Sequence, residues 1–305
     1  MSHVFAWDQI TKRFGSQQAL SRFSLSSEPG SVIALLGDNG AGKTTAIRIL
    51  LGLLEPTMGR SHVFGLDSQA HGQAIRQRVG YVPDRPALYD WMTVEQIGWF
   101  AAGFYPDGFY QRYCEYVRQF ELPITKKIKS LSKGMRSKVS LALCMGHEPE
   151  LLVLDEPTSG LDPVVRREFL DSMVDVAARG RTVLLSSHQI VEVERIADVI
   201  AIIRQGELLL VERLDKLKAE VREITLTLGQ GISSLPEFGG SIISLQQRDR
   251  QWRVLLRGSD DSHLTALRDA GHLAELEIRQ PSLEDIFVGV LKSTVSKLPA
   301  ADAAY

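Results

Sequence analysis

The sequence predicts an α/β fold in which helices cover both faces of a parallel sheet. Three observations favour this fold class. Apolar runs at 32–36, 151–154 and 182–185 have the length of buried strands. A helical pattern around 164–178 separates the second run from the third. The first run ends in a glycine-rich segment that leads into a second helical pattern at 46–54. Strands that alternate with helices in this way are typical of a doubly covered parallel sheet.

The charge balance of the chain gives no electrostatic reason to expect nucleic acid as a partner. The chain has 305 residues, and 35 Lys and Arg against 37 Asp and Glu give a formal net charge of −2. A near-neutral chain has no general electrostatic attraction to nucleic acid or anionic lipid. We therefore expect no nucleic-acid partner, and we expect any membrane contact to be made through a protein partner.

The cysteines and the first residues bear on localisation. Cys114 and Cys144 lie in helical patterns without metal-ligand spacing, so we expect a reducing cytosol and no disulfide framework. Residues 1–7 lack the basic and apolar stretches of a secretory signal. Apolar runs such as 199–203 are far shorter than the roughly 18–20 residues of a spanning helix. The sequence predicts a cytoplasmic protein that does not cross the membrane.

A helical segment interrupts the alternation of strands and helices. Thr93 and Gln96 form a capping-box pattern, and helical periodicity follows with breaks at 105–108 and at Pro123. We interpret residues 91–148 as a helical subdomain inserted in an α/β domain that spans residues 1–220.

The character of the sequence changes after about residue 220. Short strand-like runs and intervening Gly, Pro and Ser predict a small α+β domain over residues 221–298, and the Ala-rich residues 299–305 predict a disordered tail. The expected strands lie at 224–228, 241–245, 252–257 and 273–278, and the expected helices lie at 263–270 and from Ser282 onward.

A glycine-rich segment lies between the first apolar run and the helix after it. It reads GDNGAGKT from Gly37 to Thr44 and satisfies the Walker A pattern G-x-x-x-x-G-K-[ST]. The glycines let backbone N–H groups surround phosphate oxygens, and the helix N-terminus adds positive potential. Lys43 is expected to reach the β- and γ-phosphates, and Thr44 to bind Mg²⁺. A flexible turn is the alternative, which the flanking strand and helix disfavour. The expected nucleotide-binding residues are Gly37, Asp38, Asn39, Gly40, Ala41, Gly42, Lys43, Thr44 and Thr45.

The strand at 151–154 ends in two carboxylates, Asp155 and Glu156, which form a Walker B pattern. Asp155 is placed to hold Mg²⁺ directly or through water, and Glu156 to polarise the attacking water. An isolated acidic pair is usually a solvated turn. The Walker A motif upstream favours the catalytic interpretation, with ATP and Mg²⁺ as cofactors.

Further motifs follow in order along the chain. Residues 131–135 read LSKGM before the Walker B strand, and residues 159–162 read SGLD after it, followed by His188. With the Walker motifs, this order resembles the nucleotide-binding subunits of ATP-binding-cassette (ABC) transporters over roughly residues 4–220. The resemblance implies a P-loop NTPase core of the ABC ATPase type.

The resemblance also implies roles for single residues. Two chains, identical or different, would pack head to tail and enclose two ATP molecules. Each ATP would lie between the Walker motifs of one subunit and residues 131–135, the signature segment, of the other. Ser132 and the backbone of Gly134 would contact the γ-phosphate of the partner's ATP, and Asp162 would link the two sites. His188 would hold the γ-phosphate and help to orient water, although a lone histidine after a strand is more often structural. Phe14 would stack on adenine, although an aromatic residue is more often part of a core.

Three residues depart from the family pattern. The usual signature is LSGGQ, and Lys133 and Met135 replace its third and fifth residues. Lys133 either adds positive charge near the phosphate or is a solvated surface residue. Asp84 stands where the family has glutamine, so it is either a ligand of Mg²⁺ or its water, or a turn residue after Pro83. These departures are compatible with hydrolysis but put its rate in question.

The C-terminal region indicates a branch of the family. Residues 281–287 read PSLEDIF, which is similar to a segment of ATPase subunits in exporters of the antibiotic-resistance and sodium-extrusion type. The same residues also fit an ordinary amphipathic helix with Ser282 as its N-cap. We interpret the chain as an ATPase motor that MgATP closes into a dimer. It would drive a separate transmembrane permease subunit, for export, from the inner face of the cell membrane.

Two alternatives stay open. A soluble ABC-type ATPase that acts on DNA or ribosomes is disfavoured by the single motif set and the slight negative charge. A slow or non-hydrolysing, ATP-gated binding module is suggested by Asp84, Lys133 and Met135 and disfavoured by Glu156 and His188.

The resemblance implies where the membrane subunit docks. In the family, a helix of that subunit inserts beside the position of Asp84 and the following residues 85–91. Tyr89 and Trp91 are of a type enriched in interfaces, but each could equally pack inside the helical subdomain.

Overall fold

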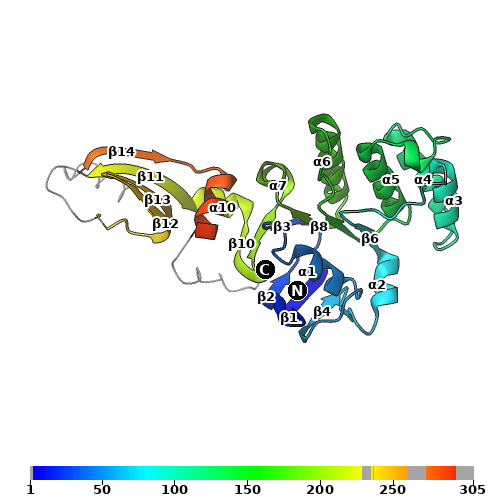
Figure 1. Ribbon diagram of the computed structural model, residues 1–305, viewed down its shortest axis with the longest axis horizontal. Helices are drawn as coiled ribbons and strands as arrows, with labels where there is room; N and C mark the ends of the chain where they lie inside the picture. Colours follow the sequence, from blue (N-terminus) through cyan, green and yellow to red (C-terminus); the bar gives the residue numbers. More distant parts are fainter. Residues whose placement is uncertain (1–2, 229–234, 236, 260–272, 293–305) are drawn as a thin grey trace. The chain divides into compact units, whose positions relative to one another are not determined.

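The computed structural model describes residues 3–228, 235, 237–259 and 273–292 (Figure 1). Its chain divides into two units, of which the first contains residues up to 199 together with 203–208, and the second contains 200–202 and the residues from 209 onward. The expected domain boundary at residue 220 stays a prediction.

A six-stranded sheet forms the centre of the α/β fold, in the strand order β10–β9–β3–β8–β7–β6. Strands β3, β8, β7 and β6 pair in parallel, as the alternating pattern predicts. Every residue of β3, β7 and β8 is buried, which explains their continuous apolar sequences. The strands are β3 (Val32–Leu36), β6 (Val79–Val82), β7 (Leu151–Asp155), β8 (Thr182–Ser187), β9 (Val199–Arg204) and β10 (Glu207–Arg213).

Helix α1 (Lys43–Leu50) directly follows the glycine-rich segment. The sequence pattern placed this helix at 46–54, which is wrong at both ends. The helix begins at Lys43 because Gly42 already serves as its N-cap. It ends before Gly52, whose positive φ of 64° is incompatible with a continuing right-handed helix.

A four-stranded antiparallel sheet in the order β2–β1–β4–β5 packs against α1. The buried indole Nε1 of Trp7 on β1 donates a hydrogen bond to the carbonyl of Ala46 in α1 at 3.0 Å. The sequence analysis did not predict these strands. They are β1 (Phe5–Phe14), β2 (Gln17–Ser26), β4 (Met58–Val63) and β5 (Leu66–Asp67).

The remaining helices of the α/β core lie beside the central sheet. Figure 1 shows α6 and α7 on the opposite side of β3 and β8 from α1. Helix α6 follows the predicted pattern at 164–178, and its N-cap is Asp162 with Pro163 in the first turn. These helices are α2 (Gly72–Arg78), α6 (Pro163–Ala178) and α7 (Ile190–Ile196).

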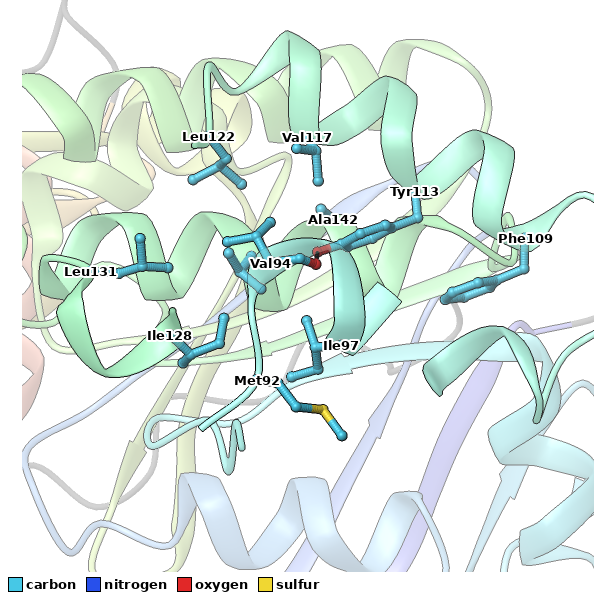
Figure 2. Close-up of a cluster of buried hydrophobic side chains, with 11 residues drawn as sticks. Met92, Val94, Ile97, Phe109, Tyr113, Val117, Leu122, Ile128, Leu131 and Ala142 are labelled. Atoms are coloured by element: carbon cyan, nitrogen blue, oxygen red, sulfur yellow. Dashed lines mark hydrogen bonds between the residues drawn. The ribbon is translucent and has the colours of Figure 1, made fainter. Parts of the chain in front are cut away.

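The helical subdomain has its own apolar core, which Figure 2 shows in close-up. The predicted capping box is confirmed, since Thr93 Oγ1 accepts from Gln96 N at 3.1 Å and Gln96 Oε1 accepts from Thr93 N at 2.9 Å. At the centre, the buried Tyr113 hydroxyl donates to the carbonyl of Val94 at 2.6 Å. The elements are α3 (Val94–Ala102), α4 (Phe109–Gln119), the 3-10 helix η1 (Ile128–Ser130) and α5 (Lys133–Met145).

The second unit contains a four-stranded antiparallel sheet in the order β12–β13–β11–β14. The predicted strands and the C-terminal helix are present, and Asp285 N donates to Ser282 Oγ at 3.1 Å, so Ser282 caps that helix. The expected helix at 263–270 and the tail at 299–305 lie outside the described residues. The elements are α8 (Leu214–Glu220), β11 (Val221–Leu228), β12 (Ser241–Arg248), β13 (Gln251–Arg257), β14 (Leu273–Arg279) and α10 (Leu283–Lys292).

Within the described part of the chain, no helix is both long and apolar enough to cross a bilayer.

Candidate nucleotide site

The glycine-rich loop connects the end of β3 to the start of α1. Gly40 and Gly42 have φ angles of 81° and 111°, a region that glycine occupies without steric cost. A Cβ atom on Gly42 would also lie 2.7 Å from the carbonyl oxygen of Ala19. Glycine is therefore required at position 42 on two grounds, backbone angle and close approach.

The first turn of α1 is open to an anion. Gly42 is the N-cap and has no side chain to accept from the helix amides, and no acidic residue lies in the first turn. Lys43 is the first residue of the helix, followed by Thr44 and Thr45. Free amides at a helix N-terminus, with the positive end of the helix dipole, form a phosphate-binding arrangement.

The Walker B strand delivers a buried carboxylate next to the loop. Asp155 is 1% exposed, and its Oδ1 accepts a hydrogen bond from Ser186 Oγ at 2.6 Å. Burial raises the pKa of Asp155, hydrogen bonds from Ser186 and Thr44 oppose this, and the charges of Glu156 and Asp84 raise the pKa further. Thr44 and Asp84, the other two residues expected to hold a metal, thus both act on the pKa of Asp155.

Glu156 contacts both of the other residues expected to take part in catalysis. Its Oε1 lies 3.0 Å from Lys43 Nζ, and its Oε2 lies 2.7 Å from His188 Nδ1. Lys43 Nζ also donates to the carbonyl of Gly37 at 2.6 Å. The Glu156 side chain is 12% exposed, so this carboxylate lies at the edge of solvent between two groups that can carry positive charge.

Ser186 is a site residue that the sequence analysis missed. Besides donating to Asp155, its Oγ accepts from the amide of Glu156 at 3.0 Å, and its carbonyl accepts from the same amide at 3.1 Å. Glu156 has a φ of 50°, which is unusual for a residue other than glycine. The sequence offered one signal from which Ser186 could have been found. It lies at the end of a strand that is expected to run parallel to the Walker B strand.

A cleft of about 610 Å³ opens beside these residues. Asn39 of the loop lines it together with Glu156 and His188. Asp84 and Lys133 line the same cleft, so two of the three departures from the family pattern face the candidate catalytic residues of their own chain. Asp84 is exposed and its Oδ2 lies 3.9 Å from Arg85 Nε.

Phe14 lies at the end of β1 with half of its surface exposed. The ammonium of Lys12 lies 5.0 Å from its ring centroid. The core alternative for Phe14 is therefore wrong, and its ring is accessible for stacking on a base.

Ser132 and Asp162, which are expected to act between two chains, are helix N-caps. Ser132 Oγ accepts from Met135 N at 3.2 Å at the start of α5, and Asp162 Oδ1 accepts from Val164 N at 3.1 Å at the start of α6. Gly134 is buried, and a Cβ there would lie 2.9 Å from Val165 Cγ1. Both caps are exposed at the chain surface.

The alternative in which Tyr89 and Trp91 pack inside the helical subdomain is also wrong. Tyr89 is 48% exposed and Trp91 is 65% exposed. Neither side chain belongs to the core of the helical subdomain.

Comparisons with known proteins show which family the chain is similar to. A family model described as "ABC transporter" matches residues 20–159. The ABC transporter ATP-binding protein YtrB of Bacillus subtilis is 31% identical over 281 residues, which cover 92% of this chain and 95% of YtrB. The daunorubicin resistance ATP-binding protein DrrA3 of Streptomyces coeruleorubidus is 33% identical over 301 residues, which cover 92% of this chain and 93% of DrrA3.

A solved structure extends the similarity to three dimensions. It is described as the ATP-binding subunit of an ABC transporter, and it aligns with a TM-score of 0.65 at 29% sequence identity. The alignment covers 71% of this chain and 92% of that chain.

Proposed function

We propose that the chain, which belongs to the family of ABC transporter ATP-binding proteins, is the motor of an exporter with a separate membrane subunit. The chain is an ATPase of that family. The observation that carries the proposal is the position of Glu156 between Lys43 and His188, at the mouth of a phosphate-binding loop. This arrangement supports hydrolysis over ATP binding alone.

The residues around Asp155 fit a magnesium ion. The charges of Glu156 and Asp84 help to raise the pKa of the buried Asp155, so a cation bound at Asp155 would relieve this repulsion. Thr44, Asp155 and Asp84 would hold the ion or its waters. When bound, Mg²⁺ would supply positive charge against the β- and γ-phosphates of ATP.

Lys43 has two sets of partners in this proposal. In the structure its ammonium contacts Glu156 and the carbonyls of Gly37 and Asp38. Phosphate oxygens at the loop would compete for the same ammonium. Lys43 would then turn from Glu156 to the phosphates and leave the carboxylate free to accept a proton from water.

His188 would position the base and the water. Its Nδ1 contacts Glu156 Oε2, which leaves Nε2 on the opposite edge of the ring for a phosphate oxygen or water. Glu156 is the general base in this scheme, and its backbone is fixed by the two hydrogen bonds from its amide to Ser186.

A second chain would complete each site. Ser132 and Asp162 are exposed at the N-termini of α5 and α6, where amides and a helix dipole favour an anion. We place Ser132 and the backbone of Gly134 against the γ-phosphate bound by the partner subunit, and Asp162 at the contact between the two sites. Phe14 would stack on adenine.

The direction of transport is proposed from the relatives. The name of DrrA3 refers to daunorubicin resistance. Together with the segment at 281–287, this supports export through a transmembrane permease subunit, with the chain bound peripherally at the inner face of the membrane.

Purification of the tagged chain with its partners tests this proposal. We expect a stoichiometric polypeptide with membrane-spanning helices to co-purify from detergent-solubilised membranes and to be identified by mass spectrometry. The assembled complex should release phosphate from ATP and lose this activity with Glu156→Gln. Stoichiometric recovery of ribosomes or DNA without such a polypeptide would contradict the transport role and favour the soluble alternative.

A further inference from the structure

A buried carboxylate on α7 contacts two segments of the chain outside its own helix. Glu192 is 5% exposed, and its Oε2 accepts a hydrogen bond from the hydroxyl of Thr158 at 2.5 Å. Its Oε1 lies 3.0 Å from Nε of Arg166 in α6. Thr158 is 2% exposed, so bulk water does not compete for its hydrogen bond. The three residues do not line the cleft beside Glu156.

The hydrogen bond between Thr158 and Glu192 joins the two segments that carry the candidate base and its histidine. Thr158 follows Glu156 by two residues, and Glu192 follows His188 by four residues. The side chains of Glu156 and His188 join the same two segments through a contact of 2.7 Å. The segments are therefore connected twice, once at the edge of the cleft and once in the interior.

The two connections differ in their access to solvent. The side chain of His188 is 40% exposed, whereas that of Glu192 is 6% exposed. An exposed imidazole can exchange a protein partner for water at little cost, so its contact with Glu156 does not by itself fix its position. A buried hydrogen bond is costly to break, because the group that loses its partner stays desolvated. The bond between Thr158 and Glu192 is thus the more rigid connection.

Arg166 extends the network to the residue before Asp162. Its Nη2 donates to the carbonyl of Leu161 at 3.1 Å, while its Nε faces Glu192. The amide of Leu161 in turn donates to the carbonyl of Thr158 at 3.1 Å. Glu192 thus holds both ends of the segment 158–161, one end directly and the other through Arg166.

The charges of the catalytic pair act on the same carboxylate. Burial raises the pKa of Glu192, and the hydrogen bond from Thr158 and the charge of Arg166 oppose this rise. The charge of His188 also lowers this pKa, whereas that of Glu156 raises it. Glu192 therefore lies within electrostatic reach of both residues of the catalytic pair.

A buried ion pair is a poor means of adding stability. Apolar residues of similar volume often stabilise a fold at least as well as a buried ion pair does. Contacts on both oxygens of a carboxylate have another effect, since they fix the direction of the side chain as well as its distance from its partners. The network around Glu192 is suited to holding a geometry.

We propose that Glu192 is a positioning residue for ATP hydrolysis. Through Thr158 it fixes the segment that carries His188 relative to the segment that carries Glu156, so that the histidine stays against the base. Glu192 acts through His188 and does not touch the nucleotide. This inference rests on the proposed function and deepens it, because it names the interior contact on which the exposed pair depends.

Phosphate release by the assembled complex tests this inference in Thr158→Val. Valine keeps the volume of threonine but cannot donate a hydrogen bond to Glu192. We expect kcat to fall at least about tenfold while KM for ATP stays within about threefold, since a misplacement of about 1 Å can cost about 100-fold in rate. Glu192→Met should have the same effect, and the double variant should be no slower than either single variant.

A His188→Ala background separates positioning from a general loss of structure. His188→Ala alone should lower kcat at least about tenfold. When Thr158→Val is added to it, kcat should fall by less than about twofold further, because the residue that the hydrogen bond positions is already absent. A purely structural role would give the full loss in both backgrounds.

Two controls keep the assignment specific. Thr158→Ser retains the hydroxyl and should keep kcat within about threefold of the parent value. Arg195→Met removes another contact between α7 and α6, since Arg195 Nη2 lies 3.5 Å from Asp171 Oδ1, and it should also leave kcat nearly unchanged. Calorimetry of ATP binding and a melting temperature well above that of the assay show that each variant is folded.

Four results would overturn the inference. They are a parental kcat in Thr158→Val, an equal loss in Thr158→Ser, an equal loss in Arg195→Met, and an undiminished effect of Thr158→Val in the His188→Ala background. The proposed function is judged separately, by the loss of phosphate release in Glu156→Gln and by the co-purifying membrane polypeptide. It would stand if only Thr158→Val behaved like the parent.

Discussion

His188 Nδ1 lies 2.7 Å from Glu156 Oε2, and the other oxygen of the same carboxylate lies 3.0 Å from Lys43 Nζ. A carboxylate contacted from both sides has a fixed orientation in a site of low exposure. In the proposed scheme the contact with Lys43 is exchanged for contacts of that lysine with the nucleotide, and the contact with His188 stays, before Glu156 accepts a proton from water. The first two predictions follow from this exchange.

Glu156→Gln should keep ATP affinity within a few-fold of the parent chain and lower turnover at least about 100-fold, because the amide cannot accept the proton of the attacking water. Phosphate release by the assembled complex measures turnover, and calorimetry measures ATP affinity. Glu115→Gln, an exposed change on α4, serves as the control. Turnover at the parental rate would remove Glu156 from its catalytic role.

Lys43→Ala should weaken ATP binding about 10- to 100-fold and also lower turnover, because the ammonium meets phosphate in the ground state and in the transition state alike. Titration calorimetry on the isolated chain measures the affinity. Lys138→Ala removes a lysine that pairs with Glu168 away from the loop, and it should bind ATP normally. Parental affinity in Lys43→Ala would contradict the assignment of the phosphate loop.

Ser132→Arg should prevent ATP-driven dimerisation while the monomer still binds ATP, since bulk and charge would meet the nucleotide of the partner subunit. Ser132→Ala is the matched control. It removes the same helix cap, at a cost of about 1 kcal/mol, without adding bulk. Light scattering with the Glu156→Gln background measures the dimer. Loss of nucleotide binding by the Ser132→Arg monomer would mean that the signature segment acts within its own chain.

Gly98→Ala should destabilise the helical subdomain by about 1–3 kcal/mol, because the new Cβ would overlap the buried ring of Tyr113. Gly103→Ala is a suitable control, since its Cβ would lie 3.4 Å from the nearest atom, the carbonyl oxygen of Phe100. Denaturant unfolding measures both. In a Tyr113→Leu background the cost of Gly98→Ala should shrink, and an unchanged cost would show that the ring is not the obstacle.

Arg257→Met should destabilise the second unit by about 3–5 kcal/mol at neutral pH, because the fully buried Glu212 would lose its guanidinium partner. Burial alone would raise the pKa of Glu212, but hydrogen bonds and the charge of Arg257 hold it below its usual value. A carboxyl group with a lowered pKa stabilises the fold above its unfolded pKa of about 4.3 and loses that contribution as the pH falls.

The difference between parent and Arg257→Met should therefore narrow as the pH falls toward about 4.5, where Glu212 of the variant is protonated more readily than in the parent. Thermal unfolding followed through Trp252, which lies in the same unit, measures the difference. A difference that grows at low pH would contradict this assignment of the pair.

The sequence predicts the parallel sheet because buried strands and helices leave strong periodic signals. It does not reveal the antiparallel sheet. Strand β1 has a left-handed residue, Gln9 with φ of 49°, and its register with β2 shifts between Trp7 and Ile10. Such irregularities interrupt the two-residue alternation on which strand prediction depends. The same limitation applies to α1, whose end is set by Gly52 and not by the apolar pattern.

The candidate site likewise contains residues that the sequence predicts and residues that it does not. The Walker residues are predicted because their chemistry requires fixed spacing within one segment. Ser186 is not, because its role depends on β8 lying beside β7, which only the folded sheet establishes. The roles of Ser132 and Asp162 between two chains stay predictions, since a single chain shows only that each caps a helix.

The hydrogen bond from Trp7 to Ala46 gives the protein an internal fluorophore for its phosphate loop. The indole is 2% exposed and its partner lies one turn from the start of α1, so a small tilt of that helix would alter the polarity around the indole. Trp91 and Trp99 are 65% and 72% exposed, so aqueous quenchers would suppress their emission first. The tryptophan emission that remains in the presence of a quencher would come largely from the buried indoles. Its wavelength could be followed on the millisecond scale while ATP binds.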